Sequence, residues 1–431
     1  MNTAGIVATL IFLIVYIIIA SEKIHRTTIS LLGATLLLVF THFTHYGAKE
    51  AFAKIDFNTI FLLIGMMVVV GITKETGIFD YLAIKTLKQT KGSPIKLLIT
   101  YSVITAVLSA FFDNVTTVLM IAPITLFATE MLKIDPKPFM ISEIFAANIG
   151  GTATLIGDPP NIMIGTKVGM TFNDFIMNTA PISIINLFIV IGIIVLFYHK
   201  EFSKKYDSDL FENINLEKVE IKDKGFLIKS LSVLAMIFTL FILQEQLEIE
   251  PSVTALFGAS LLMLITRKNV EKVFEHVEWS TIFFFIGLFI LVGGLDFTGV
   301  LKIFSEKIVN ITSGNFNLTV YLILWVSALS SSFVDNIPYT ATMIPIIKHI
   351  IPTFKNISPH SLEALWWALS IGACFGGNGT IVGASANVVI QGLAAKENHK
   401  ISFMQYFKIG FVVMIITIIT SSAYLGLVYL K

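Results

Sequence analysis

Residues 57–77 read FNTIFLLIGMMVVVGITKETG, and 222 positions further on residues 279–299 read WSTIFFFIGLFILVGGLDFTG. The two stretches align without gaps and share nine identities, including Gly65 with Gly287 and Gly77 with Gly299. At the same shift, SAFFDNVTTVLMIAPI (109–124) falls on SSFVDNIPYTATMIPI (331–346), so that one Asp-Asn pair matches another. Hydrophobicity alone would not match these polar pairs. The sequence therefore predicts a duplicated chain.

Composition predicts that lipid, and not water, surrounds most of this chain. Of its 431 residues 55% are hydrophobic and 14% are charged, and the mean hydropathy is +0.82. Apolar runs close to the ~20 residues needed to cross a bilayer recur along the chain, and each must be helical because lipid cannot pair exposed backbone groups. The expected fold is therefore an all-α polytopic membrane protein, with the lipid bilayer as its partner.

The composition also excludes several classes of function. The formal net charge of +1 predicts no nucleic-acid partner, and the single cysteine, Cys374, excludes an internal disulfide. We see no metal cluster and no set of nucleophile, base and orienting residue at membrane depth, so the sequence predicts neither a resident cofactor nor an enzyme.

The predicted spans divide the protein into two repeats and a linker. The first repeat covers 1–199, with a helical hairpin at 96–131 and a broken helix at 139–165. A polar linker follows at 200–225. The second repeat covers 226–431, with a hairpin at 317–351 and a broken helix at 361–395. Each repeat has about five spans plus a re-entrant hairpin, and an odd number of crossings turns the second repeat upside down.

The distribution of basic residues predicts the orientation of the chain in the membrane. Lysines and arginines concentrate on one side of the predicted spans, and this side is expected to be cytoplasmic. We therefore expect a multi-pass protein of the cell membrane, with both termini on the non-cytoplasmic side and the linker 200–225 in the cytoplasm.

The two hairpin tips carry the first group of candidate site residues. Asp113-Asn114 and Asp335-Asn336 interrupt apolar arms, and Pro338 removes a backbone donor just after the second pair. At membrane depth such breaks are tolerated where they line a cavity, and they present free backbone groups and helix ends to an ion. The alternative is that these residues only cap the hairpin arms. Recurrence of an ionisable residue in both halves favours a functional role, because such residues are costly in lipid.

Two glycine-rich segments carry the second group. GGTATLIGDPPN (150–161) matches GGNGTIVGASAN (376–387), with the equivalence shifted by four residues. Flexible glycines and the double proline predict that the helix unwinds before Asn161. The neutral oxygens of such a segment suit a desolvated cation or an oxyanion. The alternative is that the glycines only permit close helix packing.

Three carboxylates are expected inside the protein and are candidates for coupling to protons or cations: Asp113, Asp158 and Asp335. Asp158 has no counterpart, because Ala384 occupies the matching position, so the two halves cannot be chemically equal. Glu143 and Asp296 lie nearer to predicted helix ends, and we expect both to be solvated.

Taken together, the motifs resemble those of the ion transporter superfamily, in the branch with arsenite permeases, NhaD-type sodium/proton antiporters and the melanosomal P protein. The resemblance rests on SAFFDNVTTVLMIAPI, ANIGGTATLIGDPPNIMIG, FVDNIPYTATMIPII and GACFGGNGTIVGASANVV and covers nearly the whole chain. It implies that hairpin tips face broken helices, with sodium near Asn114 and Asn336. It also implies a homodimer with a static scaffold and a moving transport part. Asp precedes Asn at both tips, which departs from the Ser-Asn-Thr tips of dicarboxylate transporters and favours proton or cation coupling.

The expected function is ion-coupled secondary transport of a small inorganic or organic anion, such as arsenite or a carboxylate, with protons or sodium as coupling ions. The alternatives are a sodium/proton antiporter without an anion substrate and an anion channel. The predicted binding residues are Asp113, Asn114, Thr116, Thr117, Asn148, Gly150, Thr152, Thr154, Asp158, Asn161, Asp335, Asn336, Tyr339, Thr340, Asn378, Thr380, Ser385 and Asn387.

Overall fold

The computed structural model describes residues 3–21, 23–41, 46–90, 93–202, 221 and 223–430, and all regular secondary structure among them is helical. Nine helices of this described part are long and apolar enough to cross a membrane. They are α1 (Thr3–Ser21), α4 (Phe57–Lys74), α6 (Pro94–Phe111), α7 (Asn114–Met131), α11 (Ala180–Phe197), α13 (Lys224–Ile242), α17 (Trp279–Phe297), α19 (Phe316–Phe333) and α24 (Phe403–Val428). The predicted all-α membrane fold is confirmed. Most of the predicted linker, at 203–220 and 222, lies outside the described residues.

The remaining apolar helices include the two broken ones. In the first repeat α8 (Lys137–Thr152) stops and α9 (Pro159–Val168) starts after a non-helical segment, at a proline well placed in the first turn of a helix. In the second repeat the corresponding pair is α22 (Ala364–Gly376) and α23 (Ser385–Lys396), with the short turn η5 (Ile381–Gly383) between them. Three shorter apolar helices complete the bundle: α2 (Arg26–Thr41), α15 (Pro251–Thr266) and α20 (Asn336–Ile350).

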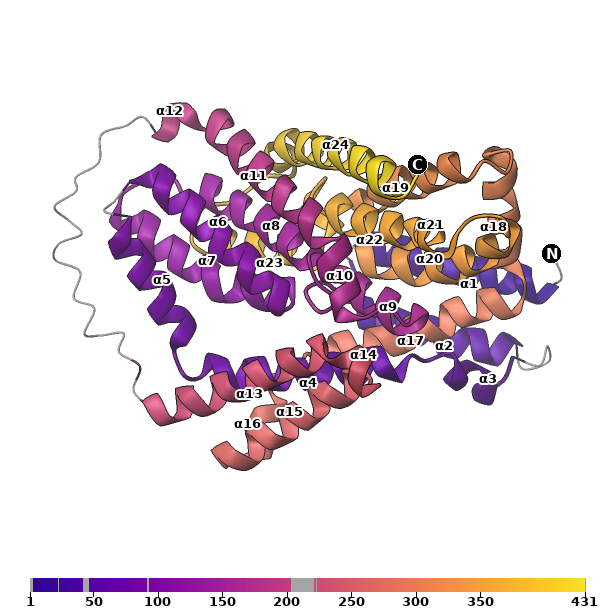
Figure 1. Ribbon diagram of the computed structural model, residues 1–431, viewed down its shortest axis with the longest axis horizontal. Coiled ribbons are helices and arrows are strands. Elements are labelled where there is room, and N and C mark those ends of the chain that lie inside the picture. The colour runs from indigo at the N-terminus through magenta and orange to yellow at the C-terminus, as the bar shows by residue number, and fades with distance from the viewer. Residues whose placement is uncertain are drawn as a thin grey trace.

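The helices form two layers along the long axis of the molecule (Figure 1). One layer holds α2, α4, α13, α15 and α17, and we call it the scaffold layer. The other holds the hairpins α6–α7 and α19–α20, the broken helices, α11 and α24, and we call it the hairpin layer. In the scaffold layer α4 packs on α15 and α17 packs on α2, so both pairs join a helix of one repeat to a helix of the other. A Cβ on Gly65 would lie 2.6 Å from the backbone of Ala255, and one on Gly287 would lie 2.8 Å from that of Ser30.

The hairpins show the inversion of the two repeats. The α6–α7 hairpin lies at one end of the molecule and the α19–α20 hairpin lies toward the other, where the chain begins (Figure 1). Helices α5 (Ile78–Gln89) and α18 (Val300–Ile311) lie at these opposite ends and occupy equivalent positions. Each follows a glycine with a positive φ, +76° at Gly77 and +77° at Gly299, where a side chain would be strained. These two glycines are among the repeat identities found in the sequence.

Short helices connect the main ones and complete the described structure. They are α3 (Ala48–Ala53), α10 (Phe172–Asn178), α12 (His199–Phe202), α14 (Gln244–Leu247), α16 (Val270–Phe274), η4 (Ile351–Thr353) and α21 (Pro359–Leu362).

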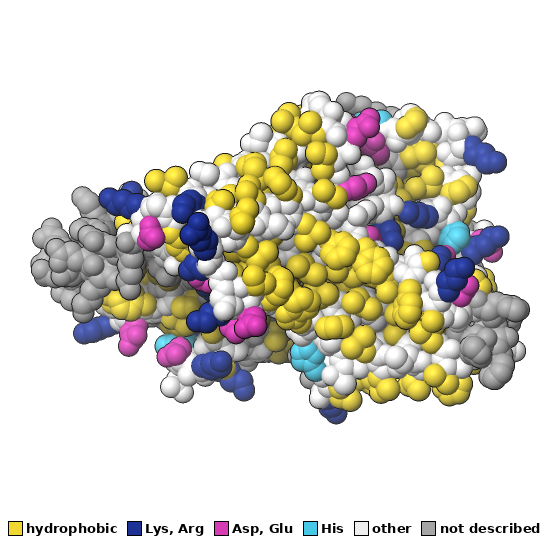
Figure 2. All heavy atoms as spheres, turned by 90° about the horizontal axis from the view of Figure 1, so that it is seen from below, with side chains coloured by type: hydrophobic (Ala, Val, Ile, Leu, Met, Phe, Trp, Pro, Cys, Tyr) yellow, Lys and Arg dark blue, Asp and Glu magenta, His cyan; other side chains and the backbone are white. Residues whose placement is uncertain are grey.

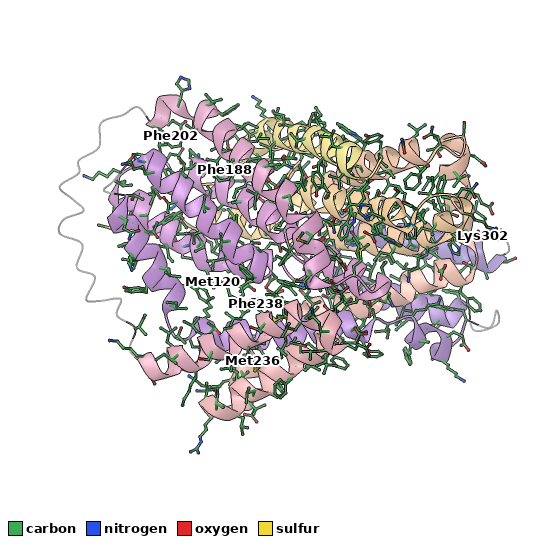
Figure 3. All side chains as sticks on the ribbon, viewed as in Figure 1. Met120, Phe188, Phe202, Met236, Phe238 and Lys302 are labelled. Carbon is green, nitrogen blue, oxygen red and sulfur yellow. The ribbon has the colours of Figure 1, made fainter. Side chains whose placement is uncertain are left out.

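The outer face of the scaffold layer carries the hydrophobic surface that lipid requires. Figure 2 shows hydrophobic side chains across the middle of this face, with charged side chains mostly toward its two ends. Apolar side chains also fill the junction between the layers. Met120 of α7 and Phe238 of α13 lie there in Figure 3, and the Phe238 ring lies 4.9 Å from the Phe111 ring. Apolar side chains therefore make up part of the contact between the two layers.

Candidate functional site

Buried asparagines join the two repeats at the centre of the protein. The Asn148 amide donates to Asn378 Oδ1 and to Asn387 Oδ1, both at 3.0 Å, and Asn114 donates to Asn148 Oδ1 at 3.4 Å. Asn336, on the opposite hairpin tip, donates to both oxygens of Asp158 at 3.3 Å. Asn114 and Asn336 are 4% and 3% exposed and line one cavity. The tips of the two hairpins thus meet inside the protein.

Each hairpin tip is built around a capping aspartate. Asp113 Oδ1 accepts from the backbone N–H of Thr116 at 2.9 Å and so caps α7, while Asp335 Oδ1 accepts from the N–H of Ile337 at 3.0 Å and caps α20. The capping alternative raised from the sequence is therefore correct as far as it goes. Each carboxylate has a second oxygen that does not take part in capping. The hydrogen-bond partners of this second oxygen differ between the two tips.

The broken helices are held to the hairpins by matching contacts. Asn161 donates to the carbonyl oxygen of Thr154 at 2.9 Å, and its equivalent Asn387 donates to that of Thr380 at the same distance. The hydroxyl of Thr154 donates to a backbone carbonyl of the first hairpin, and that of Thr380 to one of the second. The asparagine amides thus satisfy backbone carbonyls that each break exposes, and the threonine hydroxyls join each break to its hairpin.

Close backbone packing brings each broken helix against its hairpin. A Cβ on Gly150 would lie 2.1 Å from the carbonyl oxygen of Ala106, and one on Gly376 would lie 2.6 Å from that of Ala328. Glycine is therefore required at both positions for the hairpin to reach the break, so the packing alternative also holds for these residues.

An arginine that is not among the residues predicted from the sequence forms the charged centre of the site. Arg26, the first residue of α2, donates from Nη1 to Asp335 Oδ2 at 2.8 Å and to Ser385 Oγ at 2.6 Å. Its guanidinium also lies 5.1 Å from the centre of the Phe284 ring. The side chains of Arg26 and Asp335 are 25% and 13% exposed. Since Arg26 belongs to the scaffold layer and Asp335 to a hairpin tip, this ion pair crosses between the layers.

Arg26 separates two cavities of very different size. A cavity of about 20 Å³, enough for one water molecule, is lined by residues that include Asp113, Asn114, Asp158, Glu278 and Asn336. An adjoining cavity of about 360 Å³ opens beside Ile24, His25, Asp335 and Val388. Arg26 and Ser385 line both cavities. We call the smaller one the central cavity.

Carboxylates outnumber cations in the central cavity. Its lining includes three acids, Asp113, Asp158 and Glu278, and one cation, Arg26. The guanidinium of Arg26 is already paired with Asp335. Buried charges of one sign repel one another strongly, so such a group needs protons or cations to balance it. Burial and the nearby Asp113 both raise the pKa of Glu278, the residue that directly precedes α17.

The two halves of the site differ in chemistry at equivalent positions. Asp158, which is 1% exposed, corresponds to Ala384, and Asn148 corresponds to Cys374. Cys374 Sγ lies 3.6 Å from Asn161 Oδ1, where it mirrors the bond from Asn148 to Asn387 with a weaker donor. The stronger hydrogen bonding and the additional acid therefore both come from the first repeat.

Several predicted residues do not reach the central cavity. Tyr339 pairs through its hydroxyl with Ser327 of the same hairpin at 3.2 Å, and Thr152 donates to the carbonyl oxygen of Asn148 at 2.7 Å. Thr116 meets Asp113 through its backbone, and the buried hydroxyls of Thr117 and Thr340 have no partner among the described residues. Neither Tyr339 nor any of these threonines forms a wall of the central cavity.

The solvated positions expected for Glu143 and Asp296 need correction. Glu143 is 1% exposed and accepts a hydrogen bond from Thr125, because α8 lies deep in the hairpin layer. Asp296 is half-buried and pairs with Lys54 at 3.0 Å and with His349 at 3.0 Å. Glu143 lies inside α8 and not at its end, and Asp296, near the end of α17, faces Lys54 and His349.

Two signals in the sequence could have identified the missed residues. Glu278 stands 222 positions after Asp56, so both repeats place an acid directly before the helix that carries the strongest repeat identity. Arg26 is one of only two arginines in the chain, and it stands at the start of a span. A guanidinium is favoured over an ammonium where a bidentate or stacked contact is needed, which fits its position over Phe284.

Inverted repeats, opposed hairpins and broken helices that meet at a polar centre define a membrane transporter, and not an enzyme. The profile of the family described as citrate transporter matches residues 16–372, and the chain belongs to this family. It is therefore a multi-pass membrane protein that acts on an ion or small molecule.

Relatives over the full length support this assignment. The chain is 40% identical over 428 residues to a protein named as an uncharacterized transporter in Mycobacterium bovis, with 99% of each chain covered. It is also 40% identical to the 46 kDa membrane protein of Mycobacterium leprae, again with 99% of each chain covered. It is 32% identical to the human P protein, covering 98% of this chain and 60% of that protein.

A solved structure shares the fold. The YdaH transporter of Alcanivorax borkumensis, described as having an unusual topology, matches with a TM-score of 0.61 at 13% identity and covers 94% of this chain and 98% of its own. The resemblance inferred from the motifs, including that to the P protein, is confirmed by these comparisons.

Proposed function

We propose that this protein is a secondary active transporter that moves a small anion by alternating access, coupled to protons or sodium ions. The observation that carries the proposal is the pairing of Arg26, from the scaffold layer, with Asp335, from a hairpin tip, at 2.8 Å. A guanidinium binds carboxylates and oxyanions through two parallel hydrogen bonds. In this conformation the protein's own carboxylate holds that position. An arriving anion would replace it and would release the hairpin from the scaffold.

Coupling follows from the charge of the central cavity. An anion cannot enter a buried site that already holds Asp113, Asp158 and Glu278 unless positive charge enters with it. Protons taken up by these carboxylates, or a sodium ion near Asn114 and Asn336, would supply that charge. Entry of the anion would thus depend on the coupling ion, and this dependence would link the two gradients.

The substrate class follows from the family and from the anion-binding group together. A family described as citrate transporter favours a carboxylate substrate over arsenite, which is mostly uncharged in neutral water and gains little from a guanidinium. We therefore propose a small carboxylate as the substrate. Sodium/proton exchange without an anion is the second candidate, and the excess of carboxylates over cations in the central cavity favours it.

Uptake into proteoliposomes would separate these proposals. The wild-type protein should concentrate radiolabelled citrate against its gradient when a proton or sodium gradient is imposed, and arsenite should move slowly or not at all. Asp113→Asn should retain citrate exchange but lose the response to the coupling gradient. Sodium accumulation driven by protons without citrate would favour the second candidate, while downhill flux that ignores both gradients would refute coupled transport.

Two further proposals concern assembly and orientation. We propose a homodimer with both termini on the non-cytoplasmic side, supported by the resemblance and by the distribution of basic residues. Cross-linking in native membranes and protease protection of terminal tags would test them. A monomer, or tags shielded inside right-side-out vesicles, would refute them.

A further inference from the structure

A third cavity lies between the layers, toward the end of the molecule where the chain begins. It has a volume of about 240 Å³, and three lysines line it: Lys54, Lys167 and Lys348. The lysines come from three separate segments, the stretch before α4, the last turn of α9 and the last turn of α20. We call this cavity the lysine vestibule. Asp296 also lines it, so its walls carry three cationic side chains and one carboxylate.

The vestibule and the central cavity lie on the same faces of two helices. On α9, Pro159 lines the central cavity, and Met163 and Lys167 line the vestibule at successive steps of four residues. On α20, Ile337 lines the central cavity and Ala341 and Lys348 line the vestibule. Residues at this spacing lie on one face of a helix, so both helices run from one cavity to the other. At 1.5 Å per residue, the eight residues from Pro159 to Lys167 place the lysines roughly 12 Å beyond the central cavity.

Comparison of the repeats shows that this charge is confined to one side. The cavity equivalent to the vestibule lies between α7 and α23 of the opposite repeats, and its walls include Pro123, Leu126 and Leu393. These correspond to Pro345, Lys348 and Lys167, so the prolines match but two lysines stand where the other cavity has leucines. The cavity between α7 and α23 has its own charged residues, three lysines and a histidine against three acids, and is close to balanced. The lysine vestibule therefore has an excess of positive charge that the equivalent cavity between α7 and α23 lacks.

The contacts of the lysines leave them able to bind a further anion. Lys167 Nζ lies 3.7 Å from Asp56, whose Oδ2 already accepts from the hydroxyls of Thr59 and Thr166 at 3.0 and 2.9 Å. Lys348 Nζ donates to the carbonyl oxygen of Lys167 at 2.7 Å and so has two donors left. Lys54 pairs with Asp296, which also accepts from His349. The three lysines thus stand against two carboxylates, Asp56 and Asp296, and positive charge is in excess.

We propose that the lysine vestibule is an access site that attracts a polyanionic substrate, a di- or tricarboxylate, from one side of the membrane only. The substrate would bind Lys54, Lys167 and Lys348 first and then pass along α9 and α20 toward Arg26 once the layers separate. The substrate named in this inference rests on the proposed function, but the asymmetry of charge between the two cavities is independent of it. Opposite charges at the mouth of a cleft raise the local concentration of an ion and its rate of association.

Thiol labelling would test the charge of the vestibule without any transport measurement. The native Cys374 is buried, so the wild-type chain serves as the blank. Pro345→Cys places a thiol in the vestibule, and Pro123→Cys places one at the equivalent position of the other cavity. Reaction with an anionic methanethiosulfonate relative to a cationic one should be about tenfold greater at Pro345→Cys than at Pro123→Cys. Adding Lys167→Leu and Lys348→Leu should abolish the difference. Equal ratios at the two thiols would overturn the proposal.

Transport from defined sides would test the role of the vestibule. Lys167→Leu and Lys348→Leu should each raise the KM for citrate about fivefold from the vestibule side, leave kcat and the opposite KM unchanged, and flatten the dependence on salt. Lys167→Arg and Lys348→Arg keep the positive charge and should therefore have the wild-type KM. Lys133→Leu, at the opposite mouth, serves as the control. Equal effects from both sides, or no rescue by arginine, would refute the proposal. A third outcome is the expected difference in labelling between Pro345→Cys and Pro123→Cys in a protein that transports no carboxylate. This outcome would refute the proposed substrate but would still support a positively charged vestibule.

Discussion

The ion pair between Arg26 and Asp335 should couple the stability of the two layers, and a double-mutant cycle would measure that coupling. The cycle compares Arg26→Ala, Asp335→Asn and the double variant with the wild-type protein. Arg26→Ala leaves Asp335 half-buried with only Ser385 and the N–H of Ile337 as partners. Asp335→Asn removes the charge but keeps an oxygen for that N–H. The double variant should therefore be more stable than Arg26→Ala alone.

The size of the coupling can be worked from the geometry. At 2.8 Å and an effective dielectric constant of about 20, two unit charges attract by about 6 kcal/mol, most of which offsets the cost of removing both from water. Exposed pairs contribute about 0.2–1 kcal/mol, and breaking a buried pair costs about 3–5 kcal/mol. With side chains 25% and 13% exposed, this pair lies between these limits. We expect a coupling free energy of about 2 kcal/mol.

Unfolding in mixed micelles with increasing dodecyl sulfate, followed by the fluorescence of the four tryptophans, provides the assay. The pair of Lys268 with Glu75 is the matched control, because its contact of 2.7 Å is as short but its side chains are 36% and 33% exposed. Its coupling should stay below about 1 kcal/mol. If the single Arg26 and Asp335 effects add without coupling, or if both cycles give the same value, the reasoning about a partly buried interlayer ion pair is wrong.

The remaining predictions concern packing and pH. Gly150→Ala should cost about 3 kcal/mol or prevent assembly, because its Cβ would meet the carbonyl oxygen of Ala106, whereas Gly192→Ala, with nothing within 4 Å of its Cβ, should be neutral in the same thermal unfolding assay. Burial raises the pKa of Glu75, but hydrogen bonds from Lys268 and His276 lower it by more, so its stabilising contribution should be complete above pH ~5 and should vanish as the pH falls through the lowered pKa. Glu75→Gln should therefore unfold earlier than the wild type at pH 7 and together with it near pH 3; a difference that persists in acid would contradict this assignment.

The sequence predicts most of this fold because the residues that match between the two repeats have specific structural roles. Gly77 and Gly299 match because both turns need a positive φ, and the two Asp-Asn pairs match because each caps a hairpin arm. The central asparagines could be predicted for the same reason. Arg26 stands out in the sequence as one of two arginines, but its role could not be predicted, since that role depends on a contact between α2 and a tip more than 300 residues away. A basic residue beside a span is normally explained by topology.

Departures from symmetry are more informative about function than the symmetry itself. Two inverted copies with identical side chains would present the same chemistry to both sides of the membrane, and exchange of their conformations would be energetically neutral. Asp158 opposite Ala384, Asn148 opposite Cys374, and Lys167 opposite Leu393 break that equality. The first two place the acid and the stronger donor of the site on the first repeat, and the third gives one mouth an attraction for anions. If alternating access consists of exchanging the two repeats' conformations, these substitutions make the inward and outward states differ in proton and anion affinity. Replacing both Lys167 and Lys348 by leucine should remove only the last of these differences.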